Sequence, residues 1–237
     1  YAEAVRAYGR AVSKRRTNIE YLDLMRNALL KVVPPTAEEA RQHYQMNLDL
    51  LQQRAAVEPS KLDPWLPLLD AQRDRAHFLQ NPAAWRALAD TATRMRESMP
   101  AGSEGERIAL RELGVASVQR DAQLTDSERR EVEAMLRKVL SADSKDERAW
   151  DALMLLLQSD ANRQFLANQR LQGTERQREF EQALAEATAA VPDSAAVALA
   201  RIRLLRSLVA RGELDVIDAV PQLDEPLTAL EAVSSGP

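Results

Sequence analysis

Few side chains in this sequence have the type and spacing that metal binding or nucleophilic catalysis requires. The two histidines, His43 and His77, lack a second histidine at metal-ligand spacing, and neither stands in a zinc-protease motif. We therefore expect both to be surface or hairpin-packing residues. Cysteine is absent, which excludes disulfides, thiolate metal sites and a cysteine nucleophile. The sequence predicts no metal and no cofactor.

Two other patterns bear on catalysis. The segment Gly102-Ser103-Glu104-Gly105 resembles a nucleophile elbow, but its glycine spacing is wrong and no strand pattern precedes it, so a helix cap fits better. Carboxylates are abundant, and Asp70, Asp74 and Asp151 are candidates for the close acid pair of an α/α-toroid glycosidase. The three tryptophans stand at helix starts rather than in a sugar-stacking pattern, so we predict that the chain is not an enzyme.

The composition indicates a folded, helical chain. Of 237 residues, 45% are apolar, 29% are charged and only 4% are aromatic. No stretch of alternating β-branched residues predicts a strand. The net charge of −4, with both signs mixed along the chain, argues against nucleic acid as a partner, because phosphate neutralisation needs clustered Lys and Arg. No run is long and apolar enough for a membrane span, so we expect no membrane insertion by this segment.

Helix starts are marked by capping patterns. A Ser or Thr followed three residues later by Glu or Gln can satisfy two backbone donors of a first turn. Two further starts place Pro in the first turn, where its missing N–H costs nothing. The pairs are Thr17/Glu20, Thr36/Glu39, Ser103/Glu106, Thr125/Glu128, Ser144/Glu147 and Thr174/Gln177, and the Pro starts are Asp63-Pro64 and Asn81-Pro82.

These marks, with stops at Pro and Gly, divide the chain into helices joined by short connectors. Short connectors make consecutive helices pack antiparallel, so we predict one continuous array over residues 1–237, with no internal domain boundary. The array starts in the middle of a repeat, as a piece of a longer protein would. The predicted helices are residues 1–15, 18–32, 36–56, 63–79, 82–98, 104–120, 126–141, 145–158, 175–190 and 194–210; residues 160–174 are left as a further short helix or an extension, and the part after Gly212 as short helical turns.

Alternate helices carry a small-aromatic-small or apolar triplet at i, i+4 and i+7. This spacing lies along one stripe of a helix, and the first triplet returns 36 residues later in the second. The other helices place a large residue near their start, as at Trp65, Leu110 and Trp150, which we expect to fill gaps between hairpins. Trp85 is expected to be buried in the same way. The triplets are Ala4/Tyr8/Ala11, Ala40/Tyr44/Asn47, Ala84/Leu88/Thr91, Val132/Leu136/Val139 and Phe180/Leu184/Ala187.

This pattern resembles the tetratricopeptide repeat (TPR) family. The quoted segments that fit it are Trp150-Asp-Ala-Leu153, Leu110-Arg-Glu-Leu113-Gly114, Ala4/Tyr8/Ala11, Val191-Pro192 and the turn Arg211-Gly212-Glu213-Leu214. The likeness spans nearly the whole chain, although no single repeat matches throughout. Predicted first-helix starts are spaced by 45, 41, 41 and 49 residues, longer than the family's period of about 34. The resemblance implies an all-α fold, a right-handed α-solenoid of antiparallel helix pairs.

The resemblance also implies where a partner binds. In this family ligands lie along the concave surface lined by the first helix of each pair, in contact with side chains one to three turns from the helix start. The expected partner is another protein. Transferred to matching positions here, that rule gives the partner-binding residues Arg73, Asp74, Arg111, Gln119, Arg148, Asp151 and Gln158.

A narrower likeness concerns biological setting. The long, divergent, arginine-rich arrangement resembles the TPR regions of bacterial envelope scaffolds for exopolysaccharide export, such as Pel-type outer-membrane exporters. That likeness implies a periplasmic location and a periplasmic polysaccharide-modifying enzyme as the partner. The alternatives are a structural spacer between other domains and, below it, the α/α-toroid enzyme.

Overall fold

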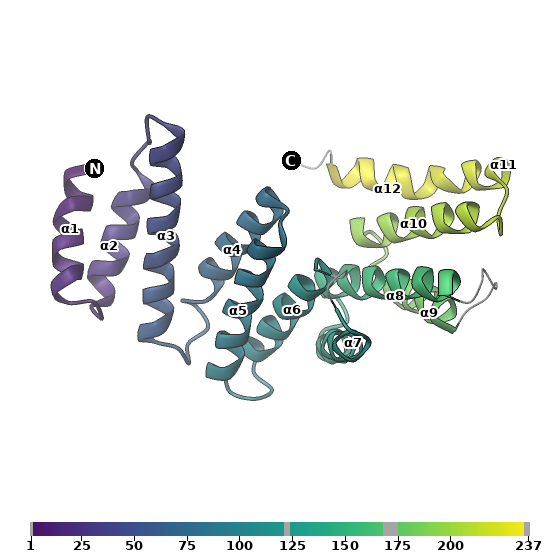
Figure 1. Ribbon diagram of the computed structural model, residues 1–237, viewed down its shortest axis with the longest axis horizontal. Helices are drawn as coiled ribbons and strands as arrows, with labels where there is room; N and C mark the ends of the chain where they lie inside the picture. Colours follow the sequence, from purple (N-terminus) through teal and green to yellow (C-terminus); the bar gives the residue numbers. More distant parts are fainter. Residues whose placement is uncertain (1, 121–123, 168–174, 235–237) are drawn as a thin grey trace. The chain divides into compact units, whose positions relative to one another are not determined.

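A computed structural model describes residues 2–120, 124–167 and 175–234. All regular elements in these ranges are helical, which confirms the predicted all-α solenoid class (Figure 1). The helices are α1 (Ala2–Lys14), α2 (Ile19–Leu30), α3 (Ala37–Val57), α4 (Leu66–Leu79), α5 (Pro82–Ser98), α6 (Glu104–Val118), α7 (Asp126–Ala142), α8 (Glu147–Ala167), α9 (Glu175–Ala190), α10 (Ala195–Arg211), α11 (Val216–Ala219), the 3-10 turn η2 (Val220–Leu223) and α12 (Asp224–Ser234).

Most predicted boundaries agree with the structure to within three residues. The exception is α8, which continues to Ala167 and not to residue 158. Of the two alternatives for residues 160–174, the extension of a neighbouring helix is therefore correct for residues 160–167. Residues 168–174 lie outside the described ranges. The C-terminal part holds a longer helix, α12, than the predicted short turns. Pro226 is accommodated there because it lies in the first turn of α12, where no intrahelical donor is needed.

The helix caps are partly as predicted. Thr125 and Glu128 form the full reciprocal box, and Thr36 accepts a hydrogen bond from the backbone N–H of Glu39. Ser103 accepts from the N–H of Glu106, so the helix cap predicted at the glycine-flanked serine is confirmed. The prediction at Thr17 is wrong, because Asn18 caps α2 through the N–H of Tyr21.

The pair Ser144/Glu147 is also a wrong prediction. The side chain of Asp146, and not that of Ser144, accepts from the first turn of α8 through the N–H of Ala149. Asx side chains compete well for this position because their carbonyl oxygen reaches the N2 or N3 donor. The pair Thr174/Gln177 involves a residue outside the described ranges.

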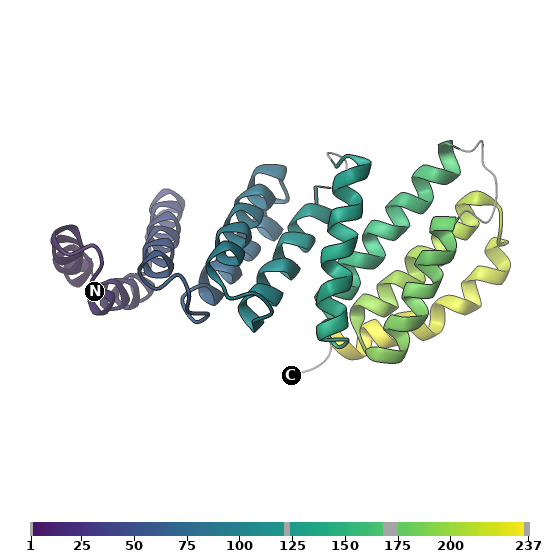
Figure 2. The same cartoon turned by 90° about the horizontal axis from the view of Figure 1, so that it is seen from below.

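The chain folds into two compact units, residues 1–112 and 113–237, and the boundary falls within α6. In the first unit α1 packs on α2, α2 on α3 and α4 on α5. In the second, α8 lies between α7, α9 and α10, and α12 covers α10 (Figure 2). The prediction of a single continuous array stays a prediction.

The core of the second unit follows the predicted stripes. Val132, Leu136 and Val139 of α7 are at most 3% exposed, and the three residues of the α9 triplet are at most 8% exposed. Gly114 explains the close approach of α6 and α7, since a Cβ at that position would lie 2.7 Å from Cδ2 of Leu136. A residue without a Cβ at this position therefore lets the two helices pack closely.

The first unit departs from the predicted stripes in two helices, and in α1 the triplet Ala4, Tyr8 and Ala11 is only half-buried. Ala84, Leu88 and Thr91 of α5 are buried as predicted. In α3, however, Tyr44 is 36% exposed and donates its hydroxyl to the carbonyl of Ala71. The core face of α3 is instead formed a turn later by Leu48, Leu50, Leu51 and Ala55.

The three tryptophans fill gaps between helices as predicted, each being at most 6% exposed. The indole of Trp65 donates to the carbonyl of Pro59 at 2.9 Å, and that of Trp150 donates to the carbonyl of Ser144 at 2.8 Å. Both acceptors lie six residues earlier, in the connector before the helix. The same local interaction thus occurs twice: a buried tryptophan at the start of a first helix holds the preceding connector through its indole N–H.

Candidate functional site

The first unit contains three of the predicted partner-binding residues. Arg73 of α4 is only 7% exposed. It forms ion pairs with Asp70 of its own helix and with Glu112 of α6, 3.5 Å away. Arg111 donates two hydrogen bonds to the same Glu112 carboxylate, at 2.8 and 3.0 Å. The two arginines therefore use their donors within the chain, while Asp74 is exposed on α4.

The second unit contains the other four. Gln119 lies just after the end of α6 and is exposed, and Arg148 is exposed in the first turn of α8. Asp151 of α8 forms an ion pair with Arg203 of α10 at 3.2 Å. Gln158, two turns further along α8, lines a groove between these two helices. Asp151 and Gln158 thus lie on the face of α8 that meets α10.

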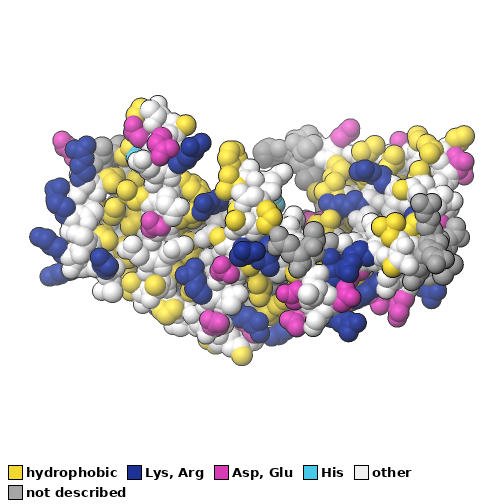
Figure 3. All heavy atoms as spheres, in the orientation of Figure 1, with side chains coloured by type: hydrophobic (Ala, Val, Ile, Leu, Met, Phe, Trp, Pro, Cys, Tyr) yellow, Lys and Arg dark blue, Asp and Glu magenta, His cyan; other side chains and the backbone are white. Residues whose placement is uncertain are grey.

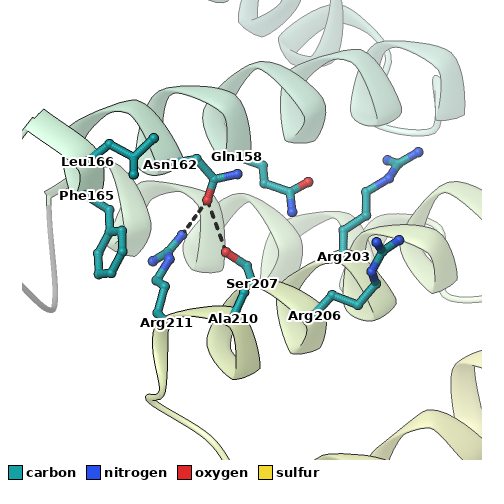
Figure 4. Close-up of a pocket in the computed structure, with 9 residues that line it drawn as sticks. All are labelled: Gln158, Asn162, Phe165, Leu166, Arg203, Arg206, Ser207, Ala210 and Arg211. Atoms are coloured by element: carbon teal, nitrogen blue, oxygen red, sulfur yellow. Dashed lines mark hydrogen bonds between the residues drawn. The ribbon is translucent and has the colours of Figure 1, made fainter. Parts of the chain in front are cut away.

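The groove between α8 and α10 has a volume of about 600 Å³. In the arrangement predicted from the sequence, α8 and α10 are the first helices of consecutive pairs, so the groove lies where that arrangement places a ligand. Figure 3 shows basic and hydrophobic side chains interspersed over this part of the surface. The lining residues are Gln158, Asn162, Phe165 and Leu166 of α8, and Arg203, Arg206, Ser207, Ala210 and Arg211 of α10 (Figure 4).

One end of the groove is rigid and apolar. The guanidinium of Arg211 lies 5.0 Å from the ring centre of Phe165, donates to Asn162 at 2.8 Å and to Gln177 of α9 at 2.8 Å. These contacts hold the side chain in place, and it is only 4% exposed. Leu166 beside it is 71% exposed, so an apolar surface faces solvent at this end (Figure 4).

The other end of the groove is basic. Arg203 forms an ion pair with Asp151. Arg206 lies one turn of α10 from Ala210 and makes no hydrogen bond or ion pair with any described residue. Among the nine lining residues three are arginines and none is acidic. Gln158, Asn162 and Ser207 between the two ends offer amide and hydroxyl groups. The arrangement can bind a chain segment through charge, hydrogen bonds and apolar contact together.

Of the predicted partner-binding residues, Gln158 lines the groove and Asp151 pairs with a lining residue, whereas the other lining residues were not predicted. Phe165 and Leu166 were missed because the predicted helix ended at residue 158, although an apolar pair one turn after Ala161 is the signal of a longer helix. The arginines of α10 were missed because the rule for first helices was not applied to residues 194–210. The spacing of Arg203, Arg206 and Ala210 along one face was the available signal.

Two smaller hollows in the described residues are lined by charged side chains. A hollow of about 180 Å³ in the first unit is lined by charges of both signs, among them Asp23, Arg26 and Asp63. A hollow of about 310 Å³ in the second unit lies over a charged cluster that joins α7, α8 and α9.

Asp160 is the centre of that cluster. It pairs with the buried Arg129 at 2.7 Å and lies 3.7 and 3.9 Å from Arg163 and Arg176. Burial raises the pKa of Asp160, against the opposing effect of the arginines, chiefly Arg129. Arg163 pairs with Asp126, and Arg176 pairs with Glu133. The charged groups of this cluster therefore pair with one another and join the helices, and we do not assign a binding site to it.

The described residues also bear on metal binding, acid-pair catalysis and membrane insertion. In the described part of the chain, no group of three or more histidines or carboxylates is arranged to hold a metal ion. Of the three aspartates considered for an acid pair, Asp70 and Asp151 are each paired with an arginine. No helix within the described ranges is both long and apolar enough to cross a membrane.

Comparison with known proteins supports the fold. No protein-family profile matches the sequence, and no curated protein matches it. Among solved structures, the chain is similar to YrrB, described as "a TPR protein with an unusual peptide-binding site". The fold is TPR-like. The superposition has a TM-score of 0.53, covers 98% of this chain and 100% of that chain, and pairs residues at 12% identity, so it supports the fold alone.

Proposed function

We propose that this chain is a non-catalytic scaffold that binds another protein, and that the groove between α8 and α10 holds a peptide segment of that partner. The observation that carries the proposal is the groove itself, about 600 Å³ in volume and lined by apolar, amide and arginine side chains. Helical folds that bind peptides do so in grooves between helices, where apolar side chains supply affinity and polar groups supply register. The peptide-binding site named for YrrB agrees with such a use of the fold.

A random-peptide display library panned on the purified chain tests this proposal. Leu166→Ser changes an exposed groove residue, and Phe78→Ser changes a residue of α4 that is 88% exposed and does not line the groove. Because neither side chain contributes to a core, both variants should fold. We expect enriched peptides to lose most of their affinity for Leu166→Ser and to keep it for Phe78→Ser. Failure to enrich any peptide, or equal loss in both variants, would contradict the proposal.

We propose further that the chain belongs to a bacterial envelope assembly protein for exopolysaccharide export, with a periplasmic polysaccharide-modifying enzyme as partner. The support is the resemblance in sequence to the TPR regions of such exporters. The test is deletion of residues 1–237 from the intact protein, with exopolysaccharide secretion measured. Restoration of secretion by an unrelated solenoid of equal length would show a spacer and contradict a binding role.

A further inference from the structure

We infer that the groove between α8 and α10 selects a short segment carrying acidic side chains next to a large apolar one, held in an extended conformation. The inference deepens the proposed peptide-binding role and depends on it. It names the chemistry of the segment from the charge, exposure and spacing of the groove residues.

The charge argument starts from the ionised groups at the groove. The carboxylates nearest its arginines are Asp151, 3.2 Å from Arg203, and Glu213, 3.9 Å from Arg211. With these two carboxylates set against three arginines, one positive charge remains. Arg206 carries it, since Arg206 is exposed and pairs with no described residue. A carboxylate of a partner can pair with Arg206 in a bidentate geometry at little desolvation cost.

The apolar argument starts from the opposite end. Leu166 is 71% exposed, and Phe165 is held under the guanidinium of Arg211. Burying a leucine-sized side chain against such a surface is favourable, because it removes apolar area on both molecules from water. The contact between Arg211 and Phe165 is already formed, so binding does not require the loss of conformational entropy of these two side chains. This end therefore favours a large apolar side chain.

The distance between the two ends sets the spacing in the ligand. Figure 4 places Phe165 and Leu166 at one end and Arg203 and Arg206 at the other. On α10, Arg206 lies four residues from Ala210 and Arg203 lies seven, which is about 6 to 10 Å at the helical rise of 1.5 Å per residue. An extended peptide advances about 3.3 Å per residue, so the acidic and apolar side chains should be about two to three positions apart.

Fluorescence anisotropy with synthetic peptides tests the inference. The probe is a labelled ten-residue peptide with two adjacent glutamates, which stand three and two positions before a leucine. Both ends are blocked so that only side chains carry negative charge. A second probe has the same residues in reverse order, because the direction of the bound segment is open. Matched peptides replace glutamate by glutamine or leucine by serine. We expect one of the two probes to bind, and each replacement to weaken binding roughly tenfold.

Protein variants assign the two ends. Arg206→Glu should weaken the acidic probe at least as much as the glutamine replacement does, and the loss should shrink when salt is raised, because screening weakens exposed charge pairs. The matched control is Arg86→Glu on α5, an exposed arginine that likewise pairs with no described residue and does not line the groove. It should bind the probe like the wild type.

Two results would overturn the inference in different ways. If library peptides bind in a Leu166-dependent manner but acidic and glutamine probes bind equally, or Arg206→Glu binds as the wild type does, the groove binds peptides and the stated selectivity is wrong. If no peptide of any charge depends on the groove residues, the proposed function fails together with the inference.

Discussion

At the scale of single residues, two helical glycines differ in whether the surrounding side chains leave room for a Cβ atom, which decides whether the higher helix propensity of alanine can stabilise the fold. A Cβ on Gly9 of α1 would lie 3.6 Å from the terminal methyl of Met25, an ordinary contact. A Cβ on Gly114 would lie 2.7 Å from Cδ2 and 3.0 Å from Cγ of Leu136, a side chain with no exposed surface. The two glycines should therefore respond to the same substitution with opposite signs.

We predict that Gly9→Ala raises the free energy of unfolding by about 0.5–1 kcal/mol, because alanine orders an exposed helix at a lower entropy cost. Gly114→Ala should lower it by about 1 kcal/mol, since overpacking against Leu136 outweighs the same gain. Urea denaturation of both variants checks this. Stabilisation by Gly114→Ala would mean that α6 and α7 are not packed as closely as described.

At the scale of the element, α2 offers a direct test of which residue caps a helix. The sequence predicts Thr17, but the structure has the side chain of Asn18 accepting from the N–H of Tyr21 at 3.0 Å. Asn18→Ala should therefore cost about 1 kcal/mol of stability, whereas Thr17→Ala should change it by less than about 0.5 kcal/mol. Thermal unfolding of the two variants decides the matter, and the opposite order of effects would restore the prediction from sequence.

The capping box of α7 should make stability depend on pH. Hydrogen bonds from the hydroxyl and the backbone N–H of Thr125 lower the pKa of Glu128 below its ordinary value. A carboxylate with a lowered pKa in the folded state stabilises the fold above its unfolded pKa, and the contribution is lost as pH falls through the folded pKa. Thr125→Ala should therefore destabilise more at about pH 7 than at about pH 3. Urea denaturation at the two pH values measures this, and an equal loss at both would show that the carboxylate takes no part.

At the scale of the whole molecule, stacked helices make stability largely local, because each contacts mainly its neighbours. Glu112 of α6 is 1% exposed and joins α6 to Arg73 of α4. We predict that Glu112→Gln lowers the free energy of unfolding by about 2 kcal/mol, since Arg73 stays buried with a weaker partner. Hydrogen exchange should accelerate in α4 and α6 and stay unchanged in α9 and α10.

The control for this change is Glu104→Gln on the same helix. Glu104 is 67% exposed and lies 3.9 Å from Arg107, so its loss should cost less than about 0.5 kcal/mol. Accelerated exchange in every helix of the Glu112→Gln variant would show that the chain unfolds as one cooperative body and not by neighbouring contacts.

Local chemistry explains what the sequence determined without a structure. Helix caps, proline stops and apolar stripes act within a few residues, so the all-α class, most helix boundaries and the burial of Trp65, Trp85 and Trp150 were predictable. The choice between adjacent caps, Thr17 or Asn18, was not predictable, because both side chains suit the position.

The tertiary structure alone decided which charged side chains are available to a partner. Arg73 and Arg206 are both arginines on a first helix, yet the first is buried against Glu112 and the second faces solvent in a groove. Sequence spacing gives the face of a helix on which a side chain lies but not the neighbour that covers it. That neighbour comes from helices tens of residues away, whose packing fixes whether a charge is consumed inside the fold or left for binding.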